Sequence, residues 1–100
     1  MQFLVTAFDG GDNEAMTRRM NARAQHIDYV EKGKAEGKFI VGGAILDDEG
    51  KMIGSSLIVD FPSKEALEKE WLANEPYVTG DVWREIDIKP FKVADLFMKK

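Results

Sequence analysis

The sequence contains no cysteine and only one histidine among its 100 residues. The absence of cysteine excludes a disulfide framework, a thiolate nucleophile and cysteine-based zinc or iron–sulfur sites. One imidazole is too few for the usual catalytic zinc site, so we expect neither a metal nor another cofactor. Any chemistry must therefore come from oxygen-bearing side chains, one imidazole and the shape of a site.

Long hydrophobic runs and an excess of positive charge are also missing. The longest apolar run, residues 39–46, contains two glycines and is much shorter than the roughly 20 residues of a membrane-spanning helix. The first residues show no basic region followed by an apolar core, so we expect no signal peptide and a cytoplasmic location. The formal charge of −4 argues against nucleic acid, which favours a basic face. We therefore expect neither nucleic acid nor a membrane as a partner.

The composition is that of a folded domain. Hydrophobic residues make up 44% of the chain and charged residues 32%, as in soluble globular proteins. The length suits one domain over residues 1–100, which can bury roughly two-thirds of the surface of the unfolded chain. No internal repeat or low-complexity segment interrupts it.

Hydrophobic patterns and turn residues predict the element order β-α-β-β-α-β. The strands are expected over residues 2–8, 38–46, 51–61 and 82–88, and the helices between Asp12 and Gly37 and between Ser63 and Glu75. This order predicts the ferredoxin-like α+β fold, in which two helices cover one face of a four-stranded antiparallel sheet.

The other face of the sheet would have no helix over it. Phe3 and Val5 point opposite to Leu4, and Leu57 and Val59 opposite to Ile58, so apolar side chains lie on both faces. We therefore predict a homodimer in which the uncovered faces pack together.

The single histidine is the first candidate functional residue. His26 carries the side chain that normally titrates near neutral pH. It lies at the border of an apolar stripe on the first helix, formed by Met16, Met20, Ala24, Ile27 and Val30. The alternative interpretation is a histidine at the surface or core edge with a satisfied hydrogen bond.

Asp9 is the second candidate, at the end of the first strand and before two glycines. A turn residue or helix cap is the alternative interpretation. The helical rise of 1.5 Å per residue carries His26 about 20 Å from the start of the helix. Spacing alone therefore does not place His26 beside Asp9.

Two further segments carry polar groups. Ser55 and Ser56 point to opposite faces of the third strand, so at most one of them faces the helices. The Glu75-Pro76-Tyr77 segment forms either a pocket rim or simply the end of the second helix. A strand serine without a demonstrated base is a weak nucleophile, and no G-x-S-x-G motif is present.

The order of these motifs resembles the YCII-related family over nearly the whole chain. The resemblance depends on Ala7-Phe8-Asp9, a long helix with Arg23 and His26, G-S-S-L-I-V-D-F at 54–61, E-P-Y-V at 75–78 and K-P-F at 89–91. The chain departs from the family at Glu75, where Asp is common before Pro-Tyr or Pro-Phe, and at Ala24, where R-P-x-H has proline. These departures concern the wall of the pocket.

The resemblance implies a dimeric ferredoxin-like enzyme with a His–Asp dyad at His26 and Asp9. It also implies a small aromatic substrate, and the residues expected to bind it are Ser56, Pro76, Tyr77 and Arg23. The implied reaction is the elimination of chloride from a chlorinated hydroxyhydroquinone to give a hydroxybenzoquinone in chlorinated-aromatic degradation. The alternatives are a non-catalytic dimeric module that binds a small ligand, and an isomerase or lactonase of a ring-cleavage product.

Overall fold

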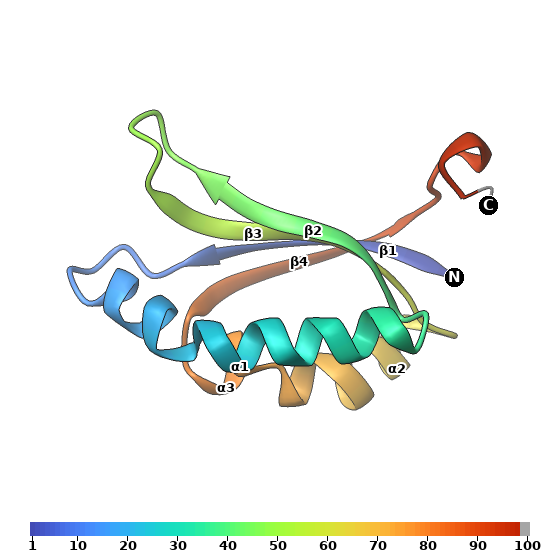
Figure 1. Ribbon diagram of the computed structural model, residues 1–100, viewed down its shortest axis with the longest axis horizontal. Coiled ribbons are helices and arrows are strands. Elements are labelled where there is room, and N and C mark those ends of the chain that lie inside the picture. Colours follow the sequence, from blue (N-terminus) through green and yellow to red (C-terminus); the bar gives the residue numbers. More distant parts are fainter. Residues whose placement is uncertain (99–100) are drawn as a thin grey trace.

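The computed structural model describes residues 1–98 and contains one antiparallel sheet with helices against one of its faces (Figure 1). The strands follow the spatial order β2-β3-β1-β4 and span Gln2–Asp9 (β1), Phe39–Leu46 (β2), Met52–Asp60 (β3) and Trp83–Phe91 (β4). The ferredoxin-like order predicted from the sequence is therefore confirmed. The last strand continues three residues beyond the predicted end at Ile88, because Gln2 and Phe3 of β1 still pair with Phe91 and Pro90.

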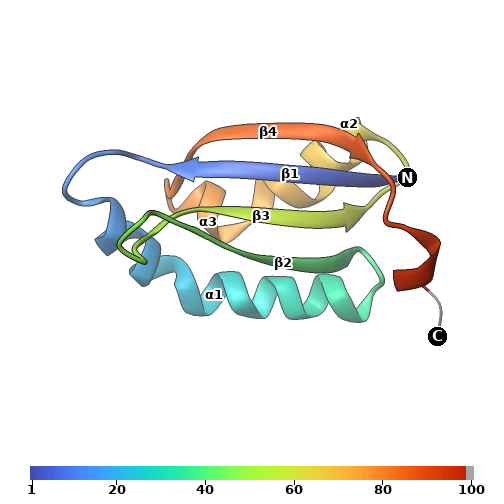
Figure 2. The ribbon, with the colours of Figure 1, turned by 90° about the horizontal axis from the view of Figure 1, so that it is seen from above.

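Two helical segments lie side by side in one layer beneath the sheet. The long helix α1 (Ala15–Ala35) runs along the β2 side, and the second helical segment lies beneath β1 and β4 (Figure 2). That segment consists of α2 (Lys64–Ala66), a π-helical turn η1 (Leu67–Trp71), a 3₁₀ turn η2 (Leu72–Asn74) and α3 (Pro76–Thr79). None of the helices within residues 1–98 is long and apolar enough to cross a membrane.

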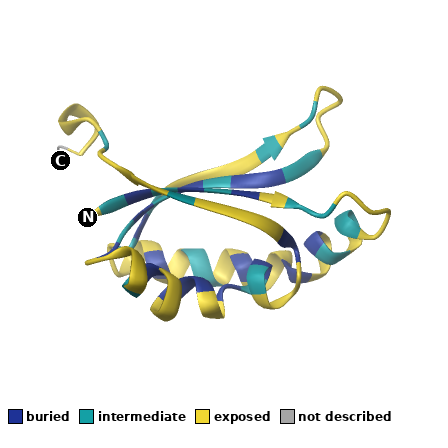
Figure 3. Cartoon of the chain, turned by 180° about the vertical axis from the view of Figure 1, so that it is seen from behind, coloured by how far each residue is buried: buried dark blue, intermediate teal, exposed yellow. Residues whose placement is uncertain are grey.

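The core lies between the sheet and the helices (Figure 3). Residues at alternate positions of β1 face the helices and pair with alternate residues of β3. The pairs on this inner face are Phe3 with Val59, Val5 with Leu57, and Ala7 with Ser55. Because the side-chain period of a strand is two, the residues between them lie on the outer face.

The buried side of α1 differs from the predicted apolar stripe. The helix buries Arg19, Ala22, His26 and Gly33, whereas Met20 is 52% exposed. The prediction was wrong because it assumed that the side facing the sheet is apolar. Here that side carries polar residues of a site, and apolar contacts come from the second helical segment and the sheet.

The second helical segment begins and ends for local reasons. Ser63 is the predicted cap, and its Oγ accepts a hydrogen bond of 3.0 Å from the backbone N–H of Ala66. The segment ends at Asn74 because Pro76 forces Glu75 into an extended conformation, with φ −70° and ψ 127°. Pro76 then starts α3, where a proline ring suits the first helical position.

Arg18 fixes the loop before α1 against the turn before β4. Its guanidinium donates hydrogen bonds of 2.9 and 2.6 Å to the Asp12 carboxylate, and Nε donates to the backbone oxygen of Asp81. The same guanidinium holds the pKa of Asp12 well below its usual range. These Arg18 hydrogen bonds lie at the end of the sheet where β1 ends with Asp9.

Candidate active site

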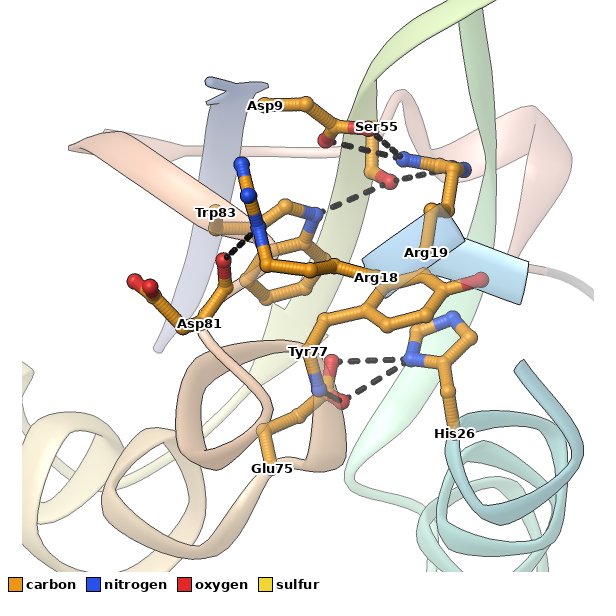
Figure 4. Close-up of polar contacts among 9 residues, drawn as sticks. All are labelled: Asp9, Arg18, Arg19, His26, Ser55, Glu75, Tyr77, Asp81 and Trp83. Atoms are coloured by element: carbon orange, nitrogen blue, oxygen red, sulfur yellow. Dashed lines mark hydrogen bonds and ion pairs between the residues drawn. The ribbon is translucent and has the colours of Figure 1, made fainter. Parts of the chain in front are cut away.

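His26 is held from one side by the carboxylate of Glu75 (Figure 4). Nδ1 of the imidazole lies 2.9 and 3.0 Å from the two carboxylate oxygens. Glu75 is fully buried, at 0% exposure, and also accepts a 2.8 Å hydrogen bond from the backbone N–H of Tyr77. An ionised carboxylate only accepts hydrogen bonds, so the hydrogen of the neutral imidazole lies on Nδ1. Nε2 therefore keeps a lone pair, and it points away from Glu75.

The three residues Glu75-Pro76-Tyr77 build this arrangement locally. Glu75 is the N-cap of α3, so its side chain turns back onto the first turn of that helix. In this one conformation the Glu75 carboxylate both caps α3 and contacts His26 on α1. The peptide after Pro76 directs the aromatic ring of Tyr77 under the same histidine, 49 residues away from Glu75 in the sequence.

Tyr77 forms the centre of an aromatic stack. Its ring lies parallel to the His26 imidazole, with centroids 3.8 Å apart and an interplanar angle of 7°. The Arg19 guanidinium lies 4.9 Å from the same ring, and Trp83 packs edge-on at 5.5 Å. In Figure 4 the Tyr77 ring lies between Arg19 and His26. Burial raises the pKa of Tyr77, against the opposing effect of the Arg19 and Arg23 charges, so the hydroxyl stays protonated at neutral pH.

A second polar cluster adjoins this stack at Arg19, which is 3% exposed. Nη1 of Arg19 lies 3.0 Å from both carboxylate oxygens of Asp9, and Nη2 donates to Ser55 Oγ at 3.0 Å. Trp83 Nε1 donates to the same Ser55 oxygen at 3.2 Å. Both lone pairs of the serine oxygen are then occupied, so the Ser55 hydroxyl can act only as a donor.

A cavity of about 270 Å³ opens between α1 and the inner face of β2 and β3. One wall carries the polar groups described above, and the floor is apolar. The lining residues are Arg19, Arg23, His26, Ile27, Val30, Phe39, Gly42, Gly43, Ala44, Met52, Ser55, Leu57 and Tyr77. No group of residues 1–98 forms a hydrogen bond with His26 Nε2 or with the Tyr77 hydroxyl. These two atoms are therefore free for a ligand.

Three predicted site residues meet at this cavity. His26, Tyr77 and Arg23 all contribute to its lining. Asp9 is not part of the lining and reaches the cluster through Arg19. The carboxylate in contact with the imidazole is that of Glu75, so the predicted direct contact between Asp9 and His26 is corrected. Asp9 at the end of the first strand contacts Arg19, which lies about two helical turns before His26 on α1.

Two other predicted residues lie outside the cavity. Ser56 pairs with Thr6 and Gly43 on the outer face of the sheet, whereas Ser55 faces α1. Pro76 lines a separate groove with Arg18 and Thr79, and its carbonyl accepts a hydrogen bond from the Gly80 N–H. Of the two serines, Ser55 is therefore the one that lines the cavity. Pro76 acts by positioning Glu75.

Sequence reasoning gave Glu75 only as part of a possible pocket rim and missed its contact with His26, and it did not assign Arg19 to the site. The spacing of Arg19 and His26, seven residues apart on one helix, places both on the same side. A carboxylate directly before a helix-starting proline also indicates an N-cap. Within residues 1–98, no three carboxylate or imidazole side chains come together as ligands for a metal ion.

Comparison with known proteins agrees with this architecture. Residues 1–92 match the YCII-related domain. An uncharacterized protein of Haemophilus influenzae is 31% identical over 77% of this chain and 84% of its own length. Protein YciI of Escherichia coli is 29% identical over 92% of this chain and 97% of its own length.

Two solved structures show the same fold. The 5-chloro-2-hydroxyhydroquinone dehydrochlorinase of Burkholderia phenoliruptrix, in complex with 2,5-dihydroxybenzoquinone, is 26% identical with a TM-score of 0.79. The similarity covers 96% of this chain and 98% of that one. An antibiotic biosynthesis monooxygenase superposes with a TM-score of 0.54 at 15% identity, over 93% of this chain and 97% of its own. This second similarity concerns the fold alone.

Proposed function

The chain belongs to the YCII-related family, and from that premise we propose that it is a cofactor-independent dehydrochlorinase. Its substrate would be a chlorinated hydroxyhydroquinone and its products a hydroxybenzoquinone and chloride. The similarity to a dehydrochlorinase over nearly the full length of both chains supports this proposal. The observation that carries it is the imidazole of His26, whose Nδ1 is held by a buried carboxylate while Nε2 is free at a cavity.

The size and lining of the cavity suit a single ring. Its volume of about 270 Å³ lies just below the range of roughly 300–1,000 Å³ that is usual for drug-sized ligands. Val30, Met52 and Leu57 offer an apolar floor for the ring. His26, Ser55 and Tyr77 offer polar atoms at its edge. A polyhydroxylated ring needs this combination of apolar floor and polar edge.

The proposed reaction requires only proton transfers and the loss of chloride. His26 Nε2 takes a proton from a ring hydroxyl and delivers it to the ring carbon that carries chlorine, which gives a ketone at the former hydroxyl. A second hydroxyl then loses its proton, and the electron pair from that O–H bond displaces chloride and completes the quinone. The substrate loses one equivalent of HCl, and no external oxidant or reductant is consumed.

The neighbouring residues would support these steps. Glu75 stabilises the imidazolium that forms when Nε2 takes the proton, because it lies 2.9 Å from Nδ1. Ser55 can only donate, so it would stabilise negative charge on a ring oxygen. Asp9 would act at a distance, by fixing the Arg19 guanidinium against Ser55 and Tyr77.

Chloride release from chlorohydroxyhydroquinone under anaerobic conditions tests this proposal. Anaerobic handling prevents the spontaneous oxidation of such phenols from imitating turnover. We expect the wild-type protein to release chloride, and His26→Ala to lose about 10²–10⁴-fold of kcat. His26→Asn is the second variant, because its amide N–H can still face Glu75 and preserve the fold. Ser56→Ala on the outer face is the matched control and should retain activity.

Full turnover by a folded His26→Ala protein would refute the mechanism. Tight binding of the phenol without any turnover would instead favour a module that binds small ligands. Turnover of a ring-cleavage product without chloride release would favour an isomerase or lactonase that uses the same imidazole.

A further inference from the structure

The charges around the cavity are not balanced. Arg19, Arg23 and His26 line it from α1, and the described lining includes no aspartate or glutamate. The basic groups therefore face a space that no lining carboxylate enters. The charge that a ligand needs therefore depends on which of these basic groups already has an acidic partner.

Two of the three basic groups have a buried partner behind the cavity wall. Arg19 pairs with Asp9, and both side chains are 4% exposed. His26 faces Glu75, so a protonated imidazole there belongs to a neutral pair. The Arg23 guanidinium, in contrast, makes no ion pair within residues 1–98. Arg23 therefore contributes one uncompensated positive charge at the exposed mouth of the cavity.

We propose that the cavity selects ring ligands that carry one negative charge on a ring oxygen, and that Arg23 supplies the opposite charge. This inference deepens the proposed function and rests on it for the ring shape of the ligand. Tyr77 lines the same cavity as Arg23, and its hydroxyl, which has no hydrogen-bond partner within residues 1–98, adds a neutral donor for the ring oxygen. A dicarboxylate from ring cleavage would leave one charge unmatched, so the arrangement favours a monoanion.

Binding of two matched quinones tests the inference. The hydroxyl of 2-hydroxy-1,4-benzoquinone is conjugated to a carbonyl, so it behaves as a vinylogous carboxylic acid and is ionised at neutral pH. Its methyl ether, 2-methoxy-1,4-benzoquinone, has nearly the same shape and no charge. The chain contains no cysteine that could add to either quinone. Isothermal titration calorimetry measures the binding of each compound, and the mass of the recovered protein checks that no lysine side chain has added to the quinone.

We expect the wild-type protein to bind the hydroxyquinone about tenfold more tightly than the methyl ether. Arg23→Gln should remove that preference by weakening only the hydroxyquinone, and Arg23→Lys should keep most of it. Lys34→Gln is the matched control, because it changes the same net charge on an exposed position of α1 outside the cavity lining.

Equal affinities of the two quinones for the wild-type protein would overturn the inference, as would failure of both to bind. An equal loss for both quinones in Arg23→Gln would also contradict it. Chloride release is a separate readout. A charge preference that depends on Arg23 without chloride release would support the inference and reject the dehydrochlorinase reaction, and chloride release without the preference would do the reverse.

Discussion

At the scale of single residues, Glu75 determines which nitrogen of His26 is available to a ligand. Its carboxylate accepts from Nδ1 and is also held by the Tyr77 N–H, so it has little freedom to turn away. In Glu75→Gln, the side-chain amide can present an N–H to Nδ1, which then favours the tautomer with hydrogen on Nε2. We expect kcat for chloride release to fall about 10²–10⁴-fold, because the general base is lost while the side-chain shape is kept.

The tautomer itself can be measured because the chain contains one histidine. With ¹⁵N-labelled histidine, long-range ¹⁵N–¹H spectra should show a protonated Nδ1 in the neutral wild-type imidazole and a protonated Nε2 in Glu75→Gln. Tyr29 lies on α1, as His26 does, and donates to the Trp71 carbonyl of η1, so Tyr29→Phe removes a neighbouring hydrogen bond and serves as a control that leaves the tautomer unchanged. An unchanged tautomer in Glu75→Gln would contradict the assigned role.

Single residues were the hardest part of the site to predict. His26 could be selected as the one imidazole, and Tyr77 and Arg23 from the family resemblance. The partner of His26 could not be found in this way, because its contact joins positions 49 residues apart. It depends on how closely the second helical segment packs beside α1, which local propensities do not encode. The resemblance gave Asp9, which instead orients Arg19.

At the scale of elements, the alternation of β3 decides which serine belongs to the site. Ser55 accepts from two buried donors, Arg19 Nη2 and Trp83 Nε1, whereas Ser56 points to the outer face. We expect Ser55→Ala to lower the free energy of unfolding by about 1–3 kcal/mol, since it leaves both donors without an acceptor. Ser56→Ala should change it by less than about 0.5 kcal/mol.

Urea unfolding followed by tryptophan fluorescence would measure both changes. Ser55→Ala should also reduce kcat, because it removes the hydroxyl that faces the ring, and Ser56→Ala should not. Equal stability of the two variants would contradict the role of Ser55 as the acceptor that Arg19 and Trp83 require.

The element order was predictable because each strand and turn carries its own local pattern. The turn at 47–50 is one example, since Asp47 Oδ1 accepts from the N–H groups of Glu49 and Lys51, and Gly50 adopts a φ of +85°. The buried face of α1 was not predictable in the same way. A hydrophobic pattern identifies the side that avoids water in a uniform core, and here Arg19 and His26 are buried in a polar cluster.

At the scale of the whole molecule, the two faces of the sheet are unequal. The inner face packs on the helices, whereas the outer face presents apolar groups at the end where β4 leaves the sheet. A cavity of about 630 Å³ lies there, and most of its lining is apolar: Ile40, Val41, Ile58, Phe91, Lys92, Val93, Ala94 and Phe97. The 3₁₀ turn η3 (Asp95–Phe97) extends past the sheet beside it (Figure 1).

The outer face therefore remains the surface for which we predict dimerisation. Val41 is 55% exposed and Phe97 72% exposed, so aspartate at both positions should leave the fold intact while placing charge in an apolar interface. In sedimentation velocity at micromolar concentration, we expect the wild-type protein to sediment as a dimer of the 11.3 kDa chain and Val41→Asp/Phe97→Asp to sediment as a monomer. At a dilution at which both proteins are monomeric, their melting temperatures should be equal.

The matched control is Met20→Asp, at a position that is 52% exposed on α1, away from the sheet. It adds one negative charge, against two in the double variant, to an exposed apolar side chain and should leave the dimer unchanged. If Met20→Asp dissociates and the double variant stays dimeric, the helix face and not the sheet face holds the subunits together. If the wild-type protein is a monomer at all concentrations tested, the apolar outer face needs another explanation, and the cavity between α1, β2 and β3 must act within a single chain.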